Sequence, residues 1–263
     1  MNCKNCNTEL TPTSEYCNSC GGKVIRNRLT IKNLFEHISE TFFNYDNKLL
    51  RTFIDLFKKP EAVIGSYVNG IRKRYVNPLS FFGVSLTLSG LSIFIIKKFY
   101  LEYFDYSKMF SSELYNNEFS QQIIENSSNS AFEYSSLIFS FMIPFMAIIS
   151  LIVFYNKHYN FTEHIIIYLY SMSALTIVSV IIGQLVLIIT PNSYLAYTFL
   201  FYLIMIIYHA FILKRIFKLS VSQLILKTLF FLVIFGAFYM IFSILAAIIM
   251  LATGEFNIQN MKP

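Results

Sequence analysis

Residues 164–213 read HIIIYLYSMSALTIVSVIIGQLVLIITPNSYLAYTFLFYLIMIIYHAFIL, without a single Asp, Glu, Lys or Arg. About 20 apolar residues already cross the hydrocarbon core of a bilayer, so this stretch is too long for one helix. Pro191 and Asn192 mark a turn inside it. The stretch therefore predicts two membrane-spanning helices, at residues 165–190 and 196–213.

Three further charge-free runs are also long enough to span a bilayer. The spans that we expect from them are residues 78–96, 135–155 and 228–252. The whole chain is 14% charged, against roughly 25% in soluble domains, and the charge-free runs rule out a fully soluble protein. We predict an all-α polytopic membrane protein with about five transmembrane helices in residues 78–252, an outer loop at residues 97–134 and a tail at residues 253–263.

Basic residues predict the orientation of these spans. Residues 1–77 and the link between the fourth and fifth spans are rich in Lys and Arg, whereas the loop at residues 97–134 is mainly acidic. The positive-inside rule then places the N-terminus in the cytosol and, because the number of spans is odd, the C-terminus outside. This topology and attraction to anionic lipid headgroups explain the net charge of +6, and no nucleic-acid partner is expected.

All four cysteines lie near the N-terminus, as Cys3-x-x-Cys6 and Cys17-x-x-Cys20. Two such pairs complete a tetrahedral site in which four thiolates bind one Zn²⁺, and a reducing cytosol keeps the thiolates available. A glycine follows the second pair and permits the positive φ of a tight turn. We predict a zinc ribbon at residues 1–28 with one structural Zn²⁺ per chain. A redox dithiol pair, disulfides or an iron–sulfur centre are the alternatives.

Residues 29–77 predict amphipathic helices on the cytosolic side of the membrane. Apolar side chains recur at helical spacing over residues 31–42 and again over residues 49–57, with Lys and Arg on other faces. A third, short helix begins at Pro60 and ends at Asn69. These helices are too charged to span the membrane. Either they pack as a cap on the transmembrane bundle, or they bind a partner or lipid headgroups.

A series of motifs runs from the cysteines to the first span. They are the two Cys-x-x-Cys pairs, Tyr45-Asp46, Thr52-Phe53, Lys59-Pro60, Tyr67-x-x-Gly70-x-Arg72 and Tyr75-x-x-Pro78. In this order they resemble a bacterial membrane-protein family known as domain of unknown function 3667, over residues 1–95. The resemblance implies a protein of the bacterial cytoplasmic (inner) membrane with a cytosolic zinc-ribbon head. It implies no activity, because the family has none assigned.

Few polar side chains lie inside the predicted spans. Gln184 and His209 are the strongly polar residues well inside them, and hydrogen bonding between helices explains His209 better than catalysis does. Arg72, Lys73 and Arg74 precede the first span. We interpret them as a topology anchor, with contact to anionic lipid or a partner as the alternative.

The predicted function depends on the water-facing part of the chain. The sequence contains no phosphate-binding loop, zinc-protease motif or hydrolase elbow, and the spans hold no paired carboxylates, so we expect no enzyme. We expect a scaffold or adaptor in the lipid bilayer whose zinc ribbon and amphipathic helices dock a cytosolic or membrane protein. The alternatives are a transporter, channel or lipid-handling protein and, third, an intramembrane enzyme. The sequence leaves the oligomeric state open.

Overall fold

The computed structural model of the chain describes residues 1–26, 30–32, 48–103, 130 and 132–252. Two compact units make up the chain, Met1–Asn47 and Lys48–Pro263. Three expected segments lie wholly or mostly outside the described residues: the helix at residues 31–42, the outer loop at residues 97–134 and the tail at residues 253–263.

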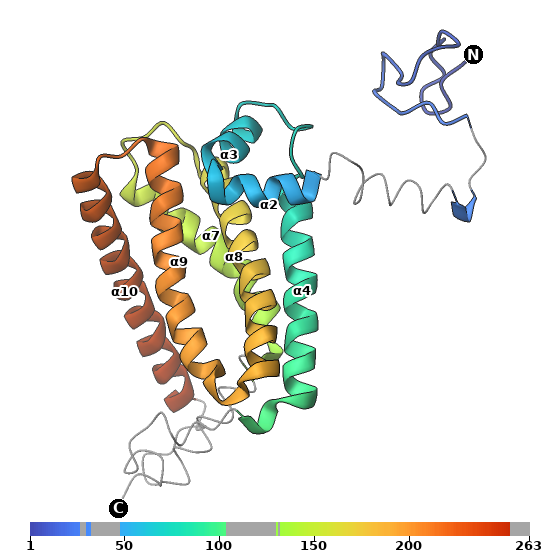
Figure 1. The fold of residues 1–263 in the computed structure, drawn as a ribbon. Helices are drawn as coiled ribbons and strands as arrows, with labels where there is room; N and C mark the ends of the chain where they lie inside the picture. The colour runs from blue at the N-terminus through green and yellow to red at the C-terminus, as the bar shows by residue number, and fades with distance from the viewer. Residues whose placement is uncertain (27–29, 33–47, 104–129, 131, 253–263) are drawn as a thin grey trace, which may run out of the picture. The chain divides into compact units, whose positions relative to one another are not determined.

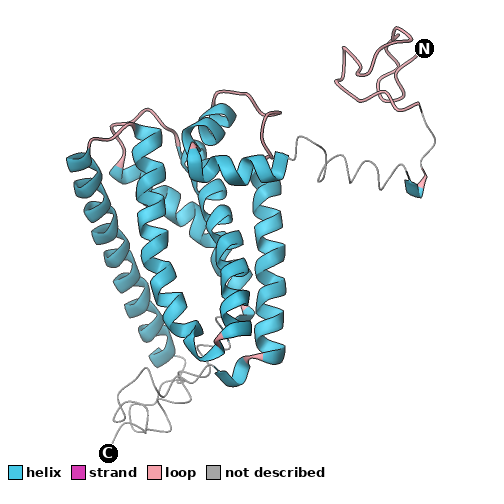
Figure 2. Cartoon of the chain, in the orientation of Figure 1, coloured by secondary structure: helices cyan, strands magenta, loops and turns pink. Residues whose placement is uncertain are grey.

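The second unit consists of helices (Figures 1 and 2). Its elements are α2 (Lys48–Lys58), α3 (Pro60–Val68), α4 (Pro78–Phe99), η1 (Leu101–Tyr103), α7 (Ser135–Val153), α8 (Phe161–Ile189), η3 (Pro191–Ser193), α9 (Tyr194–Phe217) and α10 (Val221–Ala252). Within the described residues there is no strand, and five helical segments are long and apolar enough to cross a membrane: α4, α7, α8, η3 with α9, and α10. The predicted all-helical architecture, with five helices long and apolar enough to span a membrane, is confirmed for the described residues.

Capping groups, and not the edge of the apolar run, set the start of α8. The side-chain oxygen of Asn160 accepts a hydrogen bond from the N–H of Glu163 at 3.0 Å, and the Glu163 carboxylate accepts one from the N–H of Asn160 at 2.7 Å. This capping box starts the helix at Phe161, before the beginning of the expected span. As a result His164 lies in the first turn of α8, where it is fully buried.

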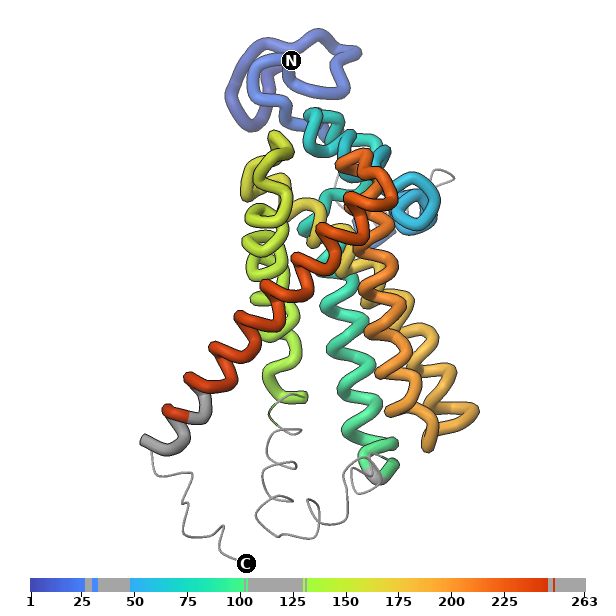
Figure 3. The backbone as a smooth tube through the Cα atoms, turned by 90° about the vertical axis from the view of Figure 1, so that its left-hand side faces the viewer, coloured from blue at the N-terminus to red at the C-terminus, as the bar shows by residue number. Residues whose placement is uncertain are grey.

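The helix α8 forms the centre of the bundle and contacts α4, α7 and α9. Its buried side chains include Ile167, Tyr168, Tyr170 and Ala174, which lie on several faces of the helix. A helix that is buried on several sides has apolar residues all round its axis. This explains why residues 164–189 of α8 contain no charged residue and show no amphipathic period. By contrast, α10 crosses the bundle obliquely, contacts α7 and α9, and has no buried residue in its apolar window (Figure 3).

The helices α2 and α3 pack onto one end of the bundle, against α8 and α9 (Figure 1). Leu56 of α2 and Val63 and Ile64 of α3 are completely buried in the hydrophobic cluster that α8 also enters. For α2 and α3, the interpretation as a cap on the bundle is therefore correct. Below, the cap denotes α2, α3 and the segment that joins α3 to α4, residues 48–77. The expected apolar face of α2 is only partly used, because Leu50 remains 50% exposed.

Polar side chains fix the position of the cap. The Oγ1 of Thr52 accepts a hydrogen bond from the N–H of Val76 at 3.1 Å, and the Tyr75 hydroxyl donates to Oδ2 of Asp55 at 2.8 Å. Thr52 and Asp55 are both buried on the inner face of α2. Burial, reinforced by Asp55, raises the pKa of Tyr75, so the hydroxyl keeps its proton and acts as the donor.

Three contacts join the cap to helices far along the chain. Tyr170 of α8 donates to the carbonyl of Val76 at 2.6 Å, and Tyr208 of α9 donates to a carbonyl of α2 at 3.4 Å. Arg215 near the end of α9 donates to both carboxylate oxygens of Glu61 and thereby lowers the pKa of that carboxyl group. Both side chains of this ion pair are partly exposed and screened by solvent, so it adds little to stability and serves mainly to fix geometry.

Replacing Tyr75 by Phe should destabilise the cap. The change removes the donor to the buried Asp55 carboxylate, which costs about 1–3 kcal/mol in the free energy of unfolding. We therefore expect a lower thermal midpoint for the detergent-solubilised protein. The matched control is Tyr155→Phe at a side chain that is 83% exposed, and it should leave the midpoint unchanged. Equal midpoints for both variants would contradict the role assigned to this hydrogen bond.

Candidate metal centre and intramembrane polar site

The first unit is built around two short hairpins, one for each cysteine pair. In the first hairpin the N–H of Cys3 donates across the turn at 2.9 Å, and the N–H of Asn7 returns to the Cys3 carbonyl at 2.8 Å. In the second the N–H of Cys17 donates across at 2.8 Å, and the N–H of Gly21 returns to the Cys17 carbonyl at 2.9 Å. The two hairpins thus repeat one backbone pattern around their first cysteines.

A residue with positive φ follows the second cysteine of each pair. Gly21 has φ +69°, in agreement with the turn geometry expected for a glycine at this place. Asn7 takes the equivalent place in the first hairpin with φ +58°. Asparagine tolerates this region better than most residues, because its short polar side chain can bond locally. This role of Asn7 was not predicted from the sequence, although its position directly after Cys6 is the signal for it.

The four thiol groups converge. All four sulfur atoms lie within 4.8 Å of one another, and the Sγ–Sγ distances are 3.7 Å for Cys3–Cys20 and 3.5 Å for Cys6–Cys17. A tetrahedral zinc site with bonds of about 2.3 Å separates its sulfur atoms by about 3.8 Å. The four cysteines are free of disulfides. The hairpins therefore bring together a thiol set that fits one four-coordinate metal ion.

Hydrogen bonds favour the metal-binding form of the two exposed cysteines. The hydroxyl of Thr8 lies 3.1 Å from Sγ of Cys6, and hydrogen bonds from Thr8 lower the pKa of Cys6 to about 6. The side chain of Asn5 lowers the pKa of Cys20. Since the thiolate is the species that binds metal, these contacts favour metal binding at Cys6 and Cys20, whereas burial and the neighbouring thiols raise the pKa of Cys17 to about 11.

The hydrophobic core of this unit is very small. It consists of Cys3, Leu10 and Cys17, with Val24 packed against them. So little buried apolar surface does not offset the entropy of ordering a chain of this length. A metal ion held by the four cysteines would add the stability that the small core of the described residues lacks, as in other small metal-binding domains.

The basic run before α4 faces outwards. Arg72, Lys73 and Arg74 are all exposed. Arg72 lies 5.4 Å from the ring centroid of Tyr67, and Arg74 lies 5.5 Å from that of Tyr75. Contacts of this kind orient a guanidinium group without covering it. A role of the run in topology, or in lipid or partner contact, stays a prediction.

The two polar residues predicted inside the spans differ in their surroundings. Gln184 of α8 donates from Nε2 to the hydroxyl of Ser92 on α4 at 2.7 Å, so it joins two helices. His209 instead bonds within its own helix, where Nδ1 lies 2.8 Å from the carbonyl of Met205. The expected hydrogen bond from His209 to another helix is therefore not formed. Its contact with α8 is a ring stack on Tyr168, with centroids 5.7 Å apart.

Two polar atoms beside this stack lack partners. His209 is only 8% exposed, and Nε2 of its ring makes no hydrogen bond to the part of the chain that the structure describes. The same holds for the hydroxyl of the fully buried Tyr168. The Ser150 hydroxyl, which is bonded to Nδ1 of His164 at 2.9 Å, lies near Tyr168 without forming a hydrogen bond to its hydroxyl. Sequence reasoning missed Tyr168, because nothing marks it among the 18 tyrosines.

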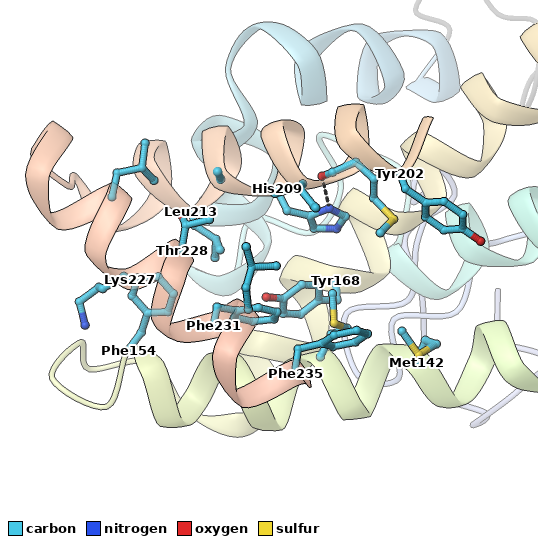
Figure 4. A pocket seen from close by; sticks show the side chains of 16 residues that line it. Met142, Phe154, Tyr168, Tyr202, His209, Leu213, Lys227, Thr228, Phe231 and Phe235 are labelled. Atoms are coloured by element: carbon cyan, nitrogen blue, oxygen red, sulfur yellow. Dashed lines mark hydrogen bonds between the residues drawn. The ribbon is translucent and has the colours of Figure 1, made fainter. Parts of the chain in front are cut away.

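Two cavities meet at His209. The smaller, of about 280 Å³, lies between α7, α8, α9 and α10 (Figure 4), and the larger, of about 600 Å³, lies between α4, α7, α8 and α9. The side chains that line both are Met142, Met146, Tyr202, Met205 and His209. Apolar side chains form most of the smaller cavity, whereas Ser, Thr and Tyr side chains contribute to the larger one.

Residues 46–90 match the model of a family described as a protein of unknown function, DUF3667. No curated protein and no solved structure matches the chain. The matched segment comprises most of the cap and the first part of α4, and for it the resemblance seen in the sequence is confirmed. Its motif residues have structural roles: Thr52 and Tyr75 bond within the cap, and Gly70 has φ +87°. The matched motifs therefore describe how the cap folds and indicate no chemistry.

Replacing Cys17 by Ser should release the metal. We expect about one metal ion per chain in the unaltered protein, in accordance with a single four-thiolate site, and none in the variant. Elemental analysis of the purified protein measures this content. Because the hairpins form a unit separate from the bundle, the thermal midpoint of the bundle should not change. The exposed Ser19, in the same hairpin, offers the matched control Ser19→Ala, which should keep its metal.

Proposed function

We propose that this protein is a membrane-anchored adaptor, in which a zinc ribbon at residues 1–28 docks a cytosolic protein partner. The observation that carries the proposal is the four-cysteine cluster in a unit separate from the bundle. Four protein ligands leave no open coordination position, so a metal bound there stabilises a surface and does not act on a substrate. The bundle then serves to hold this surface at the membrane.

The surface of the ribbon offers apolar contacts for a partner. Met1, Tyr16 and Ile25 are 47%, 52% and 66% exposed. Large apolar side chains on the surface of so small a unit favour protein contact, because aromatic residues and Met are enriched in protein interfaces. These three residues are the first candidates for the docking surface.

The distribution of charge supports a cytosolic ribbon. The pairing of Glu61 with Arg215 brings the cap and the link between α9 and α10 to the same end of the bundle. Basic residues at this end include Lys48, Arg51, Lys58, Lys59, Arg72, Lys73, Arg74, Lys214, Arg215 and Lys218. By the positive-inside rule this end faces the cytosol of a bacterium, with the N-terminus inside and the C-terminus outside. The cytosol also keeps the thiols reduced, and zinc is the ion that we propose for them.

A second candidate function is the handling of a membrane-soluble molecule. The observation that favours it is the pair of cavities that meet at His209 inside the bundle. An intramembrane enzyme is less well supported, because Gln184 is engaged in packing and His209 is stacked against Tyr168.

Deletion of residues 1–28 should abolish recovery of the cytosolic partner and leave membrane insertion intact. Crosslinking in native membranes, followed by purification of the chain, measures both. The full-length double variant Tyr16→Ala/Ile25→Ala is the sharper test, because it should keep its metal and still lose the partner. Undiminished partner recovery after the deletion would disprove the adaptor function.

A further inference from the structure

The smaller cavity has walls suited to an apolar ligand. Met142, Met146 and Met205 line it from α7 and α9, and Phe231 and Phe235 close it from α10 (Figure 4). Methionine side chains are flexible and polarizable, so such walls adapt to the shape of an occupant. With about 280 Å³, the cavity is near the lower end of the range of small-molecule pockets in proteins.

Two unpartnered groups on these walls define what such a ligand must offer. The carbonyl of Met205 can only accept, so Nδ1 of His209 carries the proton of their hydrogen bond. The apolar surroundings disfavour a charged ring, and a neutral ring with a proton on Nδ1 presents a lone pair at Nε2. The Tyr168 hydroxyl has a proton to donate, and neither atom is bonded within the described residues. Among the groups that line the cavity, Nε2 of His209 is therefore a buried acceptor without a partner, and the Tyr168 hydroxyl is a buried donor without one.

We propose that this cavity binds a membrane-soluble alcohol, an apolar molecule whose hydroxyl group donates to Nε2 of His209 and accepts from Tyr168. A hydroxyl group both donates and accepts, so it is the simplest single group whose hydrogen bonds match both atoms. Ester and ketone oxygens of lipids accept and do not donate, and a carboxylate adds the cost of a buried charge. Water is a poor occupant, because it needs two to four polar partners and most of the surrounding side chains are apolar.

The helix α10 provides access from the bilayer. Its lining residues recur on one helical face: Leu224, Lys227, Thr228, Phe231, Leu232 and Phe235. No residue of its apolar window is buried, so α10 is the least enclosed wall of the cavity. Lys227 holds the beginning of this helix against the end of α7 by donating to the carbonyl of Val153 at 2.6 Å. A ligand dissolved in the membrane enters where α10 runs on beyond this contact.

Photolabelling of the full chain in lipid nanodiscs tests the proposal. The probe is a long-chain primary alcohol with a diazirine in its chain, and the control probe is the same chain ending in a methyl group. We expect the alcohol to label α9 and α10 at lower concentration than the control probe does. This proposal deepens the second candidate function and is independent of the adaptor function.

Variants that remove one polar group at a time decide the outcome. Tyr168→Phe keeps the ring and removes the hydroxyl, so half-maximal labelling should need about fivefold more alcohol, the effect of one net hydrogen bond. Tyr202→Phe is the matched control, because Tyr202 lines the same cavity while its hydroxyl points away from His209 (Figure 4). His209→Phe keeps a ring for the stack and should abolish the preference for the alcohol over the methyl-terminated probe.

Two results would overturn the proposal: equal labelling by both probes, or equal half-maximal concentrations for the unaltered protein and Tyr168→Phe. Either would mean that acyl chains or water fill the cavity. The thermal midpoint and metal content of each variant establish that it is folded. Deletion of residues 1–28 should leave the labelling unchanged, and Tyr168→Phe should leave partner recovery unchanged. Failure of one proposed function is therefore distinguishable from failure of the other.

Discussion

Hydrocarbon offers no hydrogen-bond partner to a polar group, and this constraint governs the whole bundle. Polar side chains meet it with partners on neighbouring helices, as Gln184 does with Ser92 and as Tyr197 does by donating to the carbonyl of Ser179 at 2.9 Å. In the described residues the exceptions all lie on α8 and α9: His164, Tyr168, Ser171, Ser173 and His209 each have a buried polar atom without a partner. Of these five, Tyr168 and His209 line the smaller cavity.

The segment that matches a known family is the one that closes the end of the bundle. Its inner face combines buried apolar residues with the hydrogen bonds of Thr52 and Asp55, and Tyr170 ties it to the central helix. The four-cysteine cluster and the residues that line the smaller cavity lie outside the matched residues. The match therefore describes an architecture and indicates no chemistry.

The features that could be predicted are those that depend on neighbouring residues. The charge-free runs predicted the five long apolar helices, because the free energy gained by removing each apolar side chain from water adds up along a helix. The cysteine cluster could be predicted because all four cysteines lie close together in sequence. The buried face of α2 was not foreseen, because Thr52 and Asp55 find their partners only after the chain turns back. The stack of Tyr168 on His209 depends on how α8 and α9 are rotated against each other, which no pattern in either helix encodes.

The contact between Glu61 and Arg215 also has a consequence in time, because it joins residues that are 154 positions apart. A ribosome that adds roughly 5–20 residues per second needs about eight to thirty seconds to make that length of chain. Until then the side chains of Leu56, Val63 and Ile64 have no finished bundle to cover them. The cap therefore cannot close on the bundle before α9 has been synthesised.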